Sequence, residues 1–419
     1  MSFAADFHIH SKYSRATSPL MDLENLDKWA KIKGIKVLGT GDFTHPEWLK
    51  NLKEKLEPAE AGLFKLHSLD SPTRFILTSE ISCIYSKKGK VRKIHILVFA
   101  PSFEAVEKIN TQLAHIGNLK ADGRPILGLD AKELVKIVLD ASENCMVIPA
   151  HAWTPWFAIF GSKSGFDSIE ECFEEYSKHI YAIETGLSSN PAMNWRLSQL
   201  DKITLISNSD AHSPHKIGRE ANIFDTEISY QGIFDAIKFK DPKKFLYTIE
   251  FFPEEGKYHY DGHRACDLSF SPQESKKYNN ICPRCAKTLT IGVLNRVEEL
   301  ADRIECFKPE NVIPFKNLIP LEEIIAESIG VSTASKEVKK QYDKLIANLG
   351  SEFNILLDVK REELEKISLS EITDGIIRAR EGRVYIEPGY DGVYGKIKIF
   401  SKSENSSVGK KLISQKTLF

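Results

Sequence analysis

The sequence lacks several features that mark particular classes of protein. No apolar run approaches the length that a bilayer-spanning helix needs, and the first residues lack a basic segment followed by an apolar core. The net charge is only −1, which excludes binding to nucleic acid through the charge of the whole molecule. The seven cysteines are an odd number, which argues against a secreted disulfide framework. We therefore expect a cytoplasmic protein without membrane contact.

Short β-branched runs alternate with helical stretches through about residue 250 of the chain. This alternation predicts an α/β fold of βα units with a mainly parallel sheet. Apolar residues at helical spacing predict a helix from Asp22 to Lys33 that stops at Gly34, and a turn is predicted over Lys87–Lys90. The predicted strands are Phe3–His8, Ile35–Leu38, Phe75–Ser79, Lys93–Phe99, Cys145–Ile148, Ile180–Ile183, Ile203–Ser207 and Leu246–Ile249.

The 419 residues are too many for one ordinary core, so several domains are expected. Changes in composition place the boundaries. We predict an α/β part over 1–252, a small Cys/His-rich module over 253–306, a mainly helical region with a hairpin over 307–400, and a basic flexible tail over 401–419.

The polar residues in or after the predicted strands give the strongest functional signal. His8 and His10 follow the first strand and, two positions apart, point to the same side. Asp210 and His212 follow the seventh strand and can complete a metal site with them. Because the carboxyl ends of parallel barrel strands meet at one rim, we expect a divalent-metal site there. Further candidates at the strand ends are Asp42, His45, Glu80, His95, His151 and Glu184.

These motifs resemble the PHP family of metal-dependent phosphoesterases over about residues 1–250. The Asp-x-His-x-His string at Asp6–His10 and the run from Ala30 to Asp42 carry the resemblance, although Phe43 stands where the family has a histidine and Ala16 replaces another. The resemblance implies a distorted (β/α)7 barrel with two or three metal ions at its rim. Zn, Mg or Mn would suit such ligands.

Carried over residue by residue, the family pattern distributes the ligands among three ions. It places His8, His10, Glu80 and Asp210 around one ion, and Glu80, His95 and His151 around a second. A third ion would use His212 with Asp42 or His45. Glu80, Asp210 and His212 are thereby predicted to serve catalysis by metal-activated water, with Arg219 stabilising charge on a phosphate.

A second constellation lies in the Cys/His-rich module. It consists of His263-x2-Cys266 and Cys282-x2-Cys285, two knuckles that each supply two ligands. Four such ligands give the closed tetrahedral shell of a structural zinc site. A region this short and polar would fold poorly without a metal. We therefore predict one structural zinc ion, with unliganded thiols as the alternative.

Three strings extend the resemblance over nearly the whole chain, to the endonuclease Q family of DNA repair nucleases. They are Ser207–Glu220, Gly262–Cys266 and Pro388–Gly395. Members of that family nick DNA on the 5′ side of deaminated bases (hypoxanthine, uracil or xanthine) and of abasic sites. The resemblance therefore implies damaged double-stranded DNA as the substrate.

Residues near the predicted rim fit such a substrate, because a nuclease that inspects one base must draw it out of the stack. The substrate-binding residues that we predict are Tyr13, Trp153, Trp156, Phe157, Lys163 and Glu184. Core packing is the alternative explanation for some of the aromatic residues.

Two other functions stay open on the sequence. A small-molecule phosphatase of the histidinol-phosphate type would use the same barrel but would need neither the zinc module nor the basic-ended tail. A DNA-binding protein with a degenerate metal site would be consistent with Ala16. The final residues Gln415, Leu418 and Phe419 resemble the start of a sliding-clamp-binding peptide, and a disordered amphipathic tail is the alternative.

Overall fold

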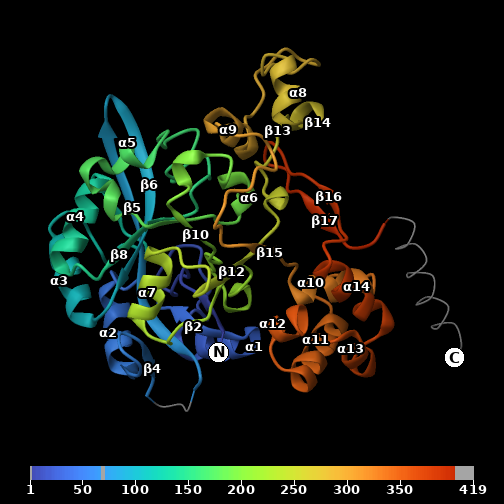
Figure 1. Cartoon of the computed structure of the whole chain (residues 1–419), viewed down its shortest axis with the longest axis horizontal. Coiled ribbons are helices and arrows are strands. Elements are labelled where there is room, and N and C mark those ends of the chain that lie inside the picture. The colour runs from blue at the N-terminus through green and yellow to red at the C-terminus, as the bar shows by residue number, and fades with distance from the viewer. Residues whose placement is uncertain (1, 68–70, 402–419) are drawn as a thin grey trace, which may run out of the picture.

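A computed structural model describes residues 2–67 and 71–401 (Figure 1). The α/β part forms one body, the Cys/His-rich module projects from one end, and a helical cluster lies beside the body (Figure 1). No helix among the described residues is long and apolar enough to cross a membrane. The predicted clamp-binding residues Gln415, Leu418 and Phe419 lie outside the described residues.

An eleven-stranded sheet organises the α/β part. Its strands are β1 (Phe3–Asp6), β2 (Ile35–Gly39), β3 (Leu56–Pro58), β4 (Phe64–Leu66), β5 (Arg74–Lys87), β6 (Lys90–Ala100), β7 (Ile126–Leu127), β8 (Met146–Pro149), β11 (Ala221–Phe224), β12 (Phe245–Glu250) and β15 (Phe315–Asn317). The order is β15-β12-β11-β1-β2-β5-β4-β3, with β6 and β7 joined to β5, and β8 joined to β6. A separate parallel pair consists of β9 (Ala182–Glu184) and β10 (Thr204–Ile206).

The prediction of a mainly parallel sheet is wrong, because the sheet is mixed. β1 pairs with β2 and β2 with β5 in parallel, but β5–β6, β6–β8, β1–β11 and β11–β12 are antiparallel. The predicted turn at Lys87–Lys90 explains the largest difference. Only Lys88 and Gly89, both at positive φ, separate β5 from β6, and so tight a connection joins antiparallel strands only. Since the ladders leave β9 and β10 as a separate pair, the closed (β/α)7 barrel stays a prediction.

Helices cover the sheet and bury its apolar face. They are α1 (Leu23–Lys33), α2 (Pro46–Lys55), α3 (Phe103–Ala114), α4 (Ala131–Ala141), α5 (Ile169–Phe173), α6 (Pro191–Asn194) and α7 (Tyr230–Lys238). The predicted helix ending at Gly34 is confirmed as α1, which begins with a side-chain cap from Asp22. It ends at Gly34 because that residue takes a left-handed conformation with φ 90°.

The rest of the chain forms the projecting module and the helical cluster. The module contains β13 (Asp261–His263), β14 (Leu268–Phe270), α8 (Pro272–Lys277) and α9 (Val293–Leu300). The cluster contains α10 (Leu321–Ser328), α11 (Lys336–Leu349), α12 (Glu352–Leu357), α13 (Arg361–Ile367) and α14 (Ser370–Arg380). The predicted hairpin near residue 390 is confirmed as the antiparallel pair β16 (Tyr385–Glu387) and β17 (Lys396–Lys398).

A buried ion pair joins α1 to the helical cluster. Lys33 Nζ donates to Glu352 Oε2 at 2.6 Å, and the Tyr342 hydroxyl donates to the same oxygen at 2.6 Å. The Leu321 amide donates to Glu352 Oε1 at 3.1 Å. The side chains of Lys33 and Glu352 are only 6% and 5% exposed. Burial opposes ionisation of Glu352, yet Lys33 lowers the pKa of this carboxyl below its usual value.

Candidate metal centre

Four side chains from distant parts of the chain meet at the end of β1. His8, His10, Glu80 and Asp210 place one donor atom each within 4.8 Å of one another. His10 Nε2 lies 3.2 Å from Glu80 Oε2 and 3.1 Å from Asp210 Oδ1. Two imidazoles and two carboxylates form a donor set that suits a divalent ion of the Zn or Mn type.

The local fold explains why this group forms. The His10 amide donates to the Ala211 carbonyl at 3.0 Å, and Ile9 bridges to Ala211 in parallel. The segment around His10 therefore lies beside the segment around Asp210, although 200 residues separate these two residues in the sequence. Asp210 has a left-handed backbone with φ 47°, a conformation that costs free energy for a non-glycine residue. The neighbouring contacts hold its carboxylate toward the histidines.

A second group shares one of these carboxylates. Glu80, His95 and His151 form a buried cluster, in which Glu80 Oε1 lies 2.7 Å from His95 Nδ1 and 3.0 Å from His151 Nε2. The β5–β6 register accounts for the first contact, because His95 lies opposite Ser82, two residues from Glu80 on the same face. Glu80 therefore belongs to both groups, each oxygen facing one of them. A carboxylate in this position can bridge two ions.

Buried carboxylates orient the first two histidines from behind. Glu184 contacts His8 Nδ1 with both oxygens at 3.0 Å and also accepts the His151 amide at 2.8 Å. Asp42 Oδ1 lies 3.1 Å from His10 Nδ1. Carboxylates that contact the other ring nitrogen are typical partners of metal-binding histidines. These contacts favour an orienting role for Glu184 and Asp42, while substrate binding by Glu184 and metal ligation by Asp42 stay predictions.

The environment of His8 tests whether a metal fits this centre. Its Nε2 atom is buried without a hydrogen-bond partner and lies 3.5 Å from Glu80 Oε2 and 3.6 Å from Asp210 Oδ1. A buried nitrogen without a partner is costly, and a cation held between it and the two carboxylates would satisfy all three groups. The residues present therefore fit a divalent ion.

The structure does not gather Asp42, His45 and His212 into a third group. The second oxygen of Asp42 accepts hydrogen bonds from the Ser11 amide at 2.6 Å and from the Ser14 hydroxyl at 2.8 Å, so its carboxylate is already engaged. His45 occupies the N-cap position of α2 without a side-chain capping hydrogen bond, and its ring stacks on Tyr13 with centroids 4.5 Å apart. The His212 ring lies 4.5 Å from that of His10, beside the first group.

The predicted substrate-binding residues separate into buried and accessible ones. Trp153 is 1% exposed, packs against the tilted ring of Phe160 and donates to Asn194 Oδ1, so it is part of the core rather than of a surface. Trp156 is 47% exposed. Phe157 lies 4.6 Å from the His95 ring, and Lys163 is exposed.

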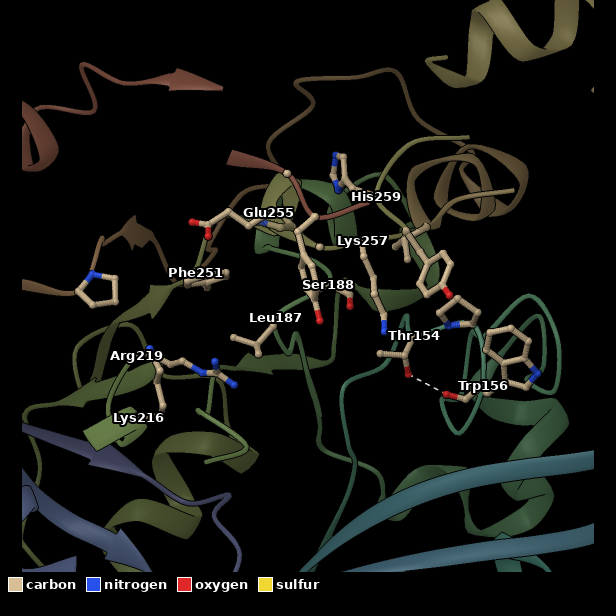
Figure 2. Close-up of a pocket in the computed structure, with 18 of the residues that line it drawn as sticks. Thr154, Trp156, Leu187, Ser188, Lys216, Arg219, Phe251, Glu255, Lys257 and His259 are labelled. Carbon is tan, nitrogen blue, oxygen red and sulfur yellow. Dashed lines mark hydrogen bonds between the residues drawn. The ribbon is translucent and has the colours of Figure 1, made fainter. Parts of the chain in front are cut away.

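A cavity of about 830 Å³ adjoins the metal centre through Thr154, a lining residue whose hydroxyl lies 3.2 Å from His151 Nδ1. Figure 2 shows Arg219 and Leu187 on one side, Trp156 on the other, and Lys257 reaching between them. All three regions of the chain contribute to it. The lining residues are Thr154, Pro155, Trp156, Leu187, Ser188, Lys216, Arg219, Phe251, Pro253, Glu255, Gly256, Lys257, Tyr258, His259, Val293, Pro320, Glu323, Tyr394 and Gly395.

The Cys/His knuckles also come together. His263, Cys266, Cys282 and Cys285 place one donor each within 4.8 Å of one another, with Cys285 Sγ 3.4 Å from His263 Nδ1. Burial would raise the pKa of Cys282, but backbone N–H groups of Arg284 and Cys285 lower it to about 6. A thiolate is the form that binds zinc, so this knuckle fits the predicted structural ion.

Two residues at the centre were not predicted from the sequence. Asn208 donates to Glu184 Oε1 at 2.9 Å and accepts the Phe7 amide at 2.9 Å, which fixes the orienting carboxylate against β1. Arg124 Nη1 donates to Glu80 Oε2 at 3.0 Å. Asn208 adjoins the Asp210 motif, which is the signal that could have revealed it. No periodicity or motif marks Arg124.

Charge around Glu80 keeps it ionised. Burial would raise the pKa of this carboxyl, but His95, Arg124 and His8 lower it well below its usual value. In return Glu80 raises the pKa of Arg124. An ionised bridging carboxylate is the form that can ligate cations.

Two solved structures match this chain over nearly its whole length. The lesion-specific endonuclease PfuEndoQ from Pyrococcus furiosus has a crystal structure that matches with a TM-score of 0.85 and 31% identity, over 97% of this chain and 99% of that one. A solved endonuclease Q in complex with a 27-mer duplex substrate with an abasic lesion at its active site matches with a TM-score of 0.83 and 32% identity, over 96% and 98% of the two chains. The chain belongs to the endonuclease Q family. It is accordingly an enzyme of the nuclease class.

Sequence relatives of this endonuclease Q family member are found in an archaeon and a bacterium. The uncharacterized protein YqxK of Bacillus subtilis is 30% identical over 94% of this chain and 98% of its own length. The uncharacterized protein MJ0043 of Methanocaldococcus jannaschii is 36% identical over 59% of this chain, a match that spans 31% of that longer protein. The family model for the MJ0043 C-terminal domain matches residues 320–383, which lie in the helical cluster.

The orienting role of Glu184 leads to a first prediction. Replacing Glu184 with glutamine should weaken metal binding at the centre by about 10- to 100-fold, because the His8 ring loses the charged partner that fixes it. Titration of metal-free protein with Mn²⁺, followed by calorimetry, measures the change. Asp201→Asn, a change at a surface aspartate paired with Arg303, is the matched control. Equal Mn²⁺ affinity in the Glu184 variant and the control would contradict the orienting role.

Proposed function

We propose that this chain is a DNA repair endonuclease that nicks the phosphodiester bond 5′ of a deaminated base (hypoxanthine, uracil or xanthine) or of an abasic site. The observation that supports the proposal is that Glu80 belongs to two candidate ligand groups, in a chain that matches a lesion-bound endonuclease Q over 96% of its length. A distorted PHP barrel is the scaffold that we propose for this site. Cleavage would leave a 3′-hydroxyl and a 5′-phosphate.

The chain's own residues supply the positioning that this reaction needs. When bound, divalent ions at the two groups would activate water and neutralise charge on the phosphate. Glu80 and Asp210 provide the anionic ligands, while Glu184 and Asp42 hold His8 and His10 in place. The centre is buried on the protein side, so charge developing on the phosphate is stabilised in a low-dielectric setting.

The neighbouring cavity suits an extruded nucleotide. Trp156, Leu187 and Phe251 offer apolar surface, and Lys216, Arg219 and Lys257 offer charged groups that donate hydrogen bonds but accept none. Such donors pair with the carbonyl oxygen that deamination creates, and they do not pair with the amino group that it replaces. Glu255 and Glu323 also line the cavity and could accept from an amino group, so hypoxanthine and uracil would be favoured over adenine and cytosine where the base edge faces the three cations.

A cleavage assay tests the proposed function. End-labelled duplexes would carry one hypoxanthine, one uracil, one abasic site or only normal bases, and would be incubated with Mg²⁺ or Mn²⁺. We expect a single nick 5′ of the altered position and none with Asp210→Asn, which weakens one ligand of the first group. Intact DNA under every metal tested would contradict the proposal, and hydrolysis of small phosphate esters under the same conditions would favour a phosphatase.

Trp156 gives a prediction about selectivity. Replacing it with alanine should lower the ratio of cleavage of hypoxanthine-containing DNA to normal DNA by about 10-fold, since stacking on an aromatic ring contributes about 1–3 kcal/mol per base. The bound metal should be unchanged, because Trp156 is not among the ligand groups. Competition assays with both duplexes measure the ratio. Tyr385→Ala, at another exposed aromatic residue outside the cavity lining, is the control. An unchanged ratio would remove Trp156 from the pocket.

A further inference from the structure

Arg124 occupies a position that its ion pair with Glu80 does not fully explain. Its Nη1 atom donates to Glu80 Oε2 at 3.0 Å, yet the Arg124 side chain is 26% exposed while that of Glu80 is fully buried. The guanidinium therefore lies between the ligand groups and solvent. A guanidinium has five N–H donors in a planar fork, more than one contact with a carboxylate uses.

The loop that carries Arg124 is fixed against the metal centre. The Gly123 amide donates to the Tyr13 carbonyl at 3.0 Å, and the Thr44 hydroxyl donates to the Gly123 carbonyl at 3.1 Å. A Cβ atom at Gly123 would come within 2.3 Å of Asp42 Oδ2 and of Ser14 Oγ, so the backbone approaches the orienting carboxylate as closely as glycine permits. Asp122 accepts the Arg124 amide at 3.1 Å.

Arg124 lies close to the first ligand group as well as to Glu80. The Glu80 Oε2 atom that accepts from Arg124 also lies 3.2 Å from His10 Nε2 and 3.5 Å from His8 Nε2. A cation so placed lies next to the position that a phosphate would take when it contacts ions at Glu80. If Arg124 only neutralised the charge of Glu80, none of its N–H groups would need to be exposed to solvent.

We propose that Arg124 binds a non-bridging oxygen of the scissile phosphate with its exposed N–H groups while its other edge holds Glu80. This inference rests on the proposed function, because it names the group that receives the phosphate in that reaction. The residue would both orient the phosphate and stabilise the charge that develops on it during attack.

A binding measurement without metal tests this contact directly. Two duplexes with the same abasic-site analogue would carry either the natural phosphate or an uncharged methylphosphonate at the linkage 5′ of the lesion. Fluorescence anisotropy in EDTA should show that the wild-type protein binds the phosphate about 10- to 100-fold more tightly, the range for a hydrogen bond to a charged group. In Arg124→Gln this difference should disappear. An equal difference in the variant and the wild type would overturn the proposal.

Cleavage and metal analysis complete the test. Arg124→Gln should lower kcat by about 10²-fold, as the loss of one oxyanion donor does, while the metal content per chain stays unchanged. Arg124→Lys, which keeps the charge but not the fork, should recover part of the rate and also serves if the glutamine variant folds poorly. Arg383→Gln, at an exposed arginine paired with Glu381, is the matched control. Loss of metal from Arg124→Gln would instead show that the only role of Arg124 is to hold the Glu80 carboxylate in place.

The outcomes separate the two proposals. If the wild-type enzyme leaves lesion-containing DNA intact, the proposed function fails. If the wild type nicks that DNA and Arg124→Gln nicks it at the same rate, only the role of Arg124 fails.

Discussion

Replacing Glu80 with glutamine should remove metal from both ligand groups at once and lower kcat by at least about 10³-fold. The metal ions of such a site contribute several kcal/mol of transition-state stabilisation, and each 1.36 kcal/mol is a factor of ten in rate. Glu80 is the residue that the two groups share, so no other single substitution in them should have this double effect. Metal analysis by mass spectrometry should show loss of more than one ion per chain.

Glu250→Gln is the matched control for this experiment. Glu250 is as buried as Glu80 but accepts hydrogen bonds from Thr185 and Thr248 instead of facing the histidines. Metal content and kcat should therefore stay near the wild-type values in this variant. Loss of a single ion from Glu80→Gln would contradict the bridging role, and loss of none would contradict both ligand assignments.

The Cys282→Ser variant should lose one zinc ion and with it the order of the projecting module. A structural zinc contributes its binding free energy to folding, about 10–16 kcal/mol in zinc-finger peptides. Few large apolar side chains of the module are buried, among them Leu289, Val293 and Val297, so little else would replace that contribution. Limited proteolysis should therefore cut the variant between residues 253 and 306, whereas the wild type should resist. Lesion cleavage should fall as well, because module residues Tyr258, His259 and Val293 line the cavity.

Cys306→Ser controls for the loss of a thiol, because Cys306 is exposed and lies outside the ligand group. Its zinc content and protease resistance should match the wild type. Ligands of the metal centre at the end of β1 must be removed in a parallel sample, the double variant Glu80→Gln with Asp210→Asn. Any zinc that remains in it can then be assigned to the module. If no zinc remains in that sample, the structural site does not exist. Intact zinc in Cys282→Ser would remove Cys282 from the shell.

Local patterns in the sequence predicted α1, the β16–β17 hairpin and most strand positions of the α/β part well. They also identified candidate ligands that lie together in the fold, and the metal-binding roles of these residues stay predictions. Asp22 and Gly34 mark both ends of α1, and His8 and His10 mark the end of β1, because caps and metal ligands have narrow chemical requirements. Strand direction was predicted less well. The sequence predicts the turn at Lys88 and Gly89. Such a tight turn implies an antiparallel β5–β6 pair, which is inconsistent with the predicted mainly parallel sheet.

Long-range contacts account for most of what the sequence did not reveal. Trp153 and Trp156 stand three residues apart in the same aromatic run, yet one packs in the core and the other faces solvent. Nothing in their spacing distinguishes them. Glu184 follows a strand as the candidate ligands do, and only the fold shows that its carboxylate contacts His8 Nδ1. Arg124 reaches Glu80 across 44 positions of sequence.

The buried ion pair between Lys33 and Glu352 has a consequence for how this chain can be divided. A fragment that ends after the Cys/His-rich module would keep Lys33 but lose the carboxylate, the tyrosine hydroxyl and the helix start that surround it. The fragment would also expose to water the apolar surface that Ile35 and Phe353 share in one hydrophobic core, which costs about 25 cal/mol per Å² of apolar surface. We therefore expect that the α/β part, which carries the metal centre, does not fold stably without the helical cluster. Its fold is completed by a helix more than three hundred residues further along the chain.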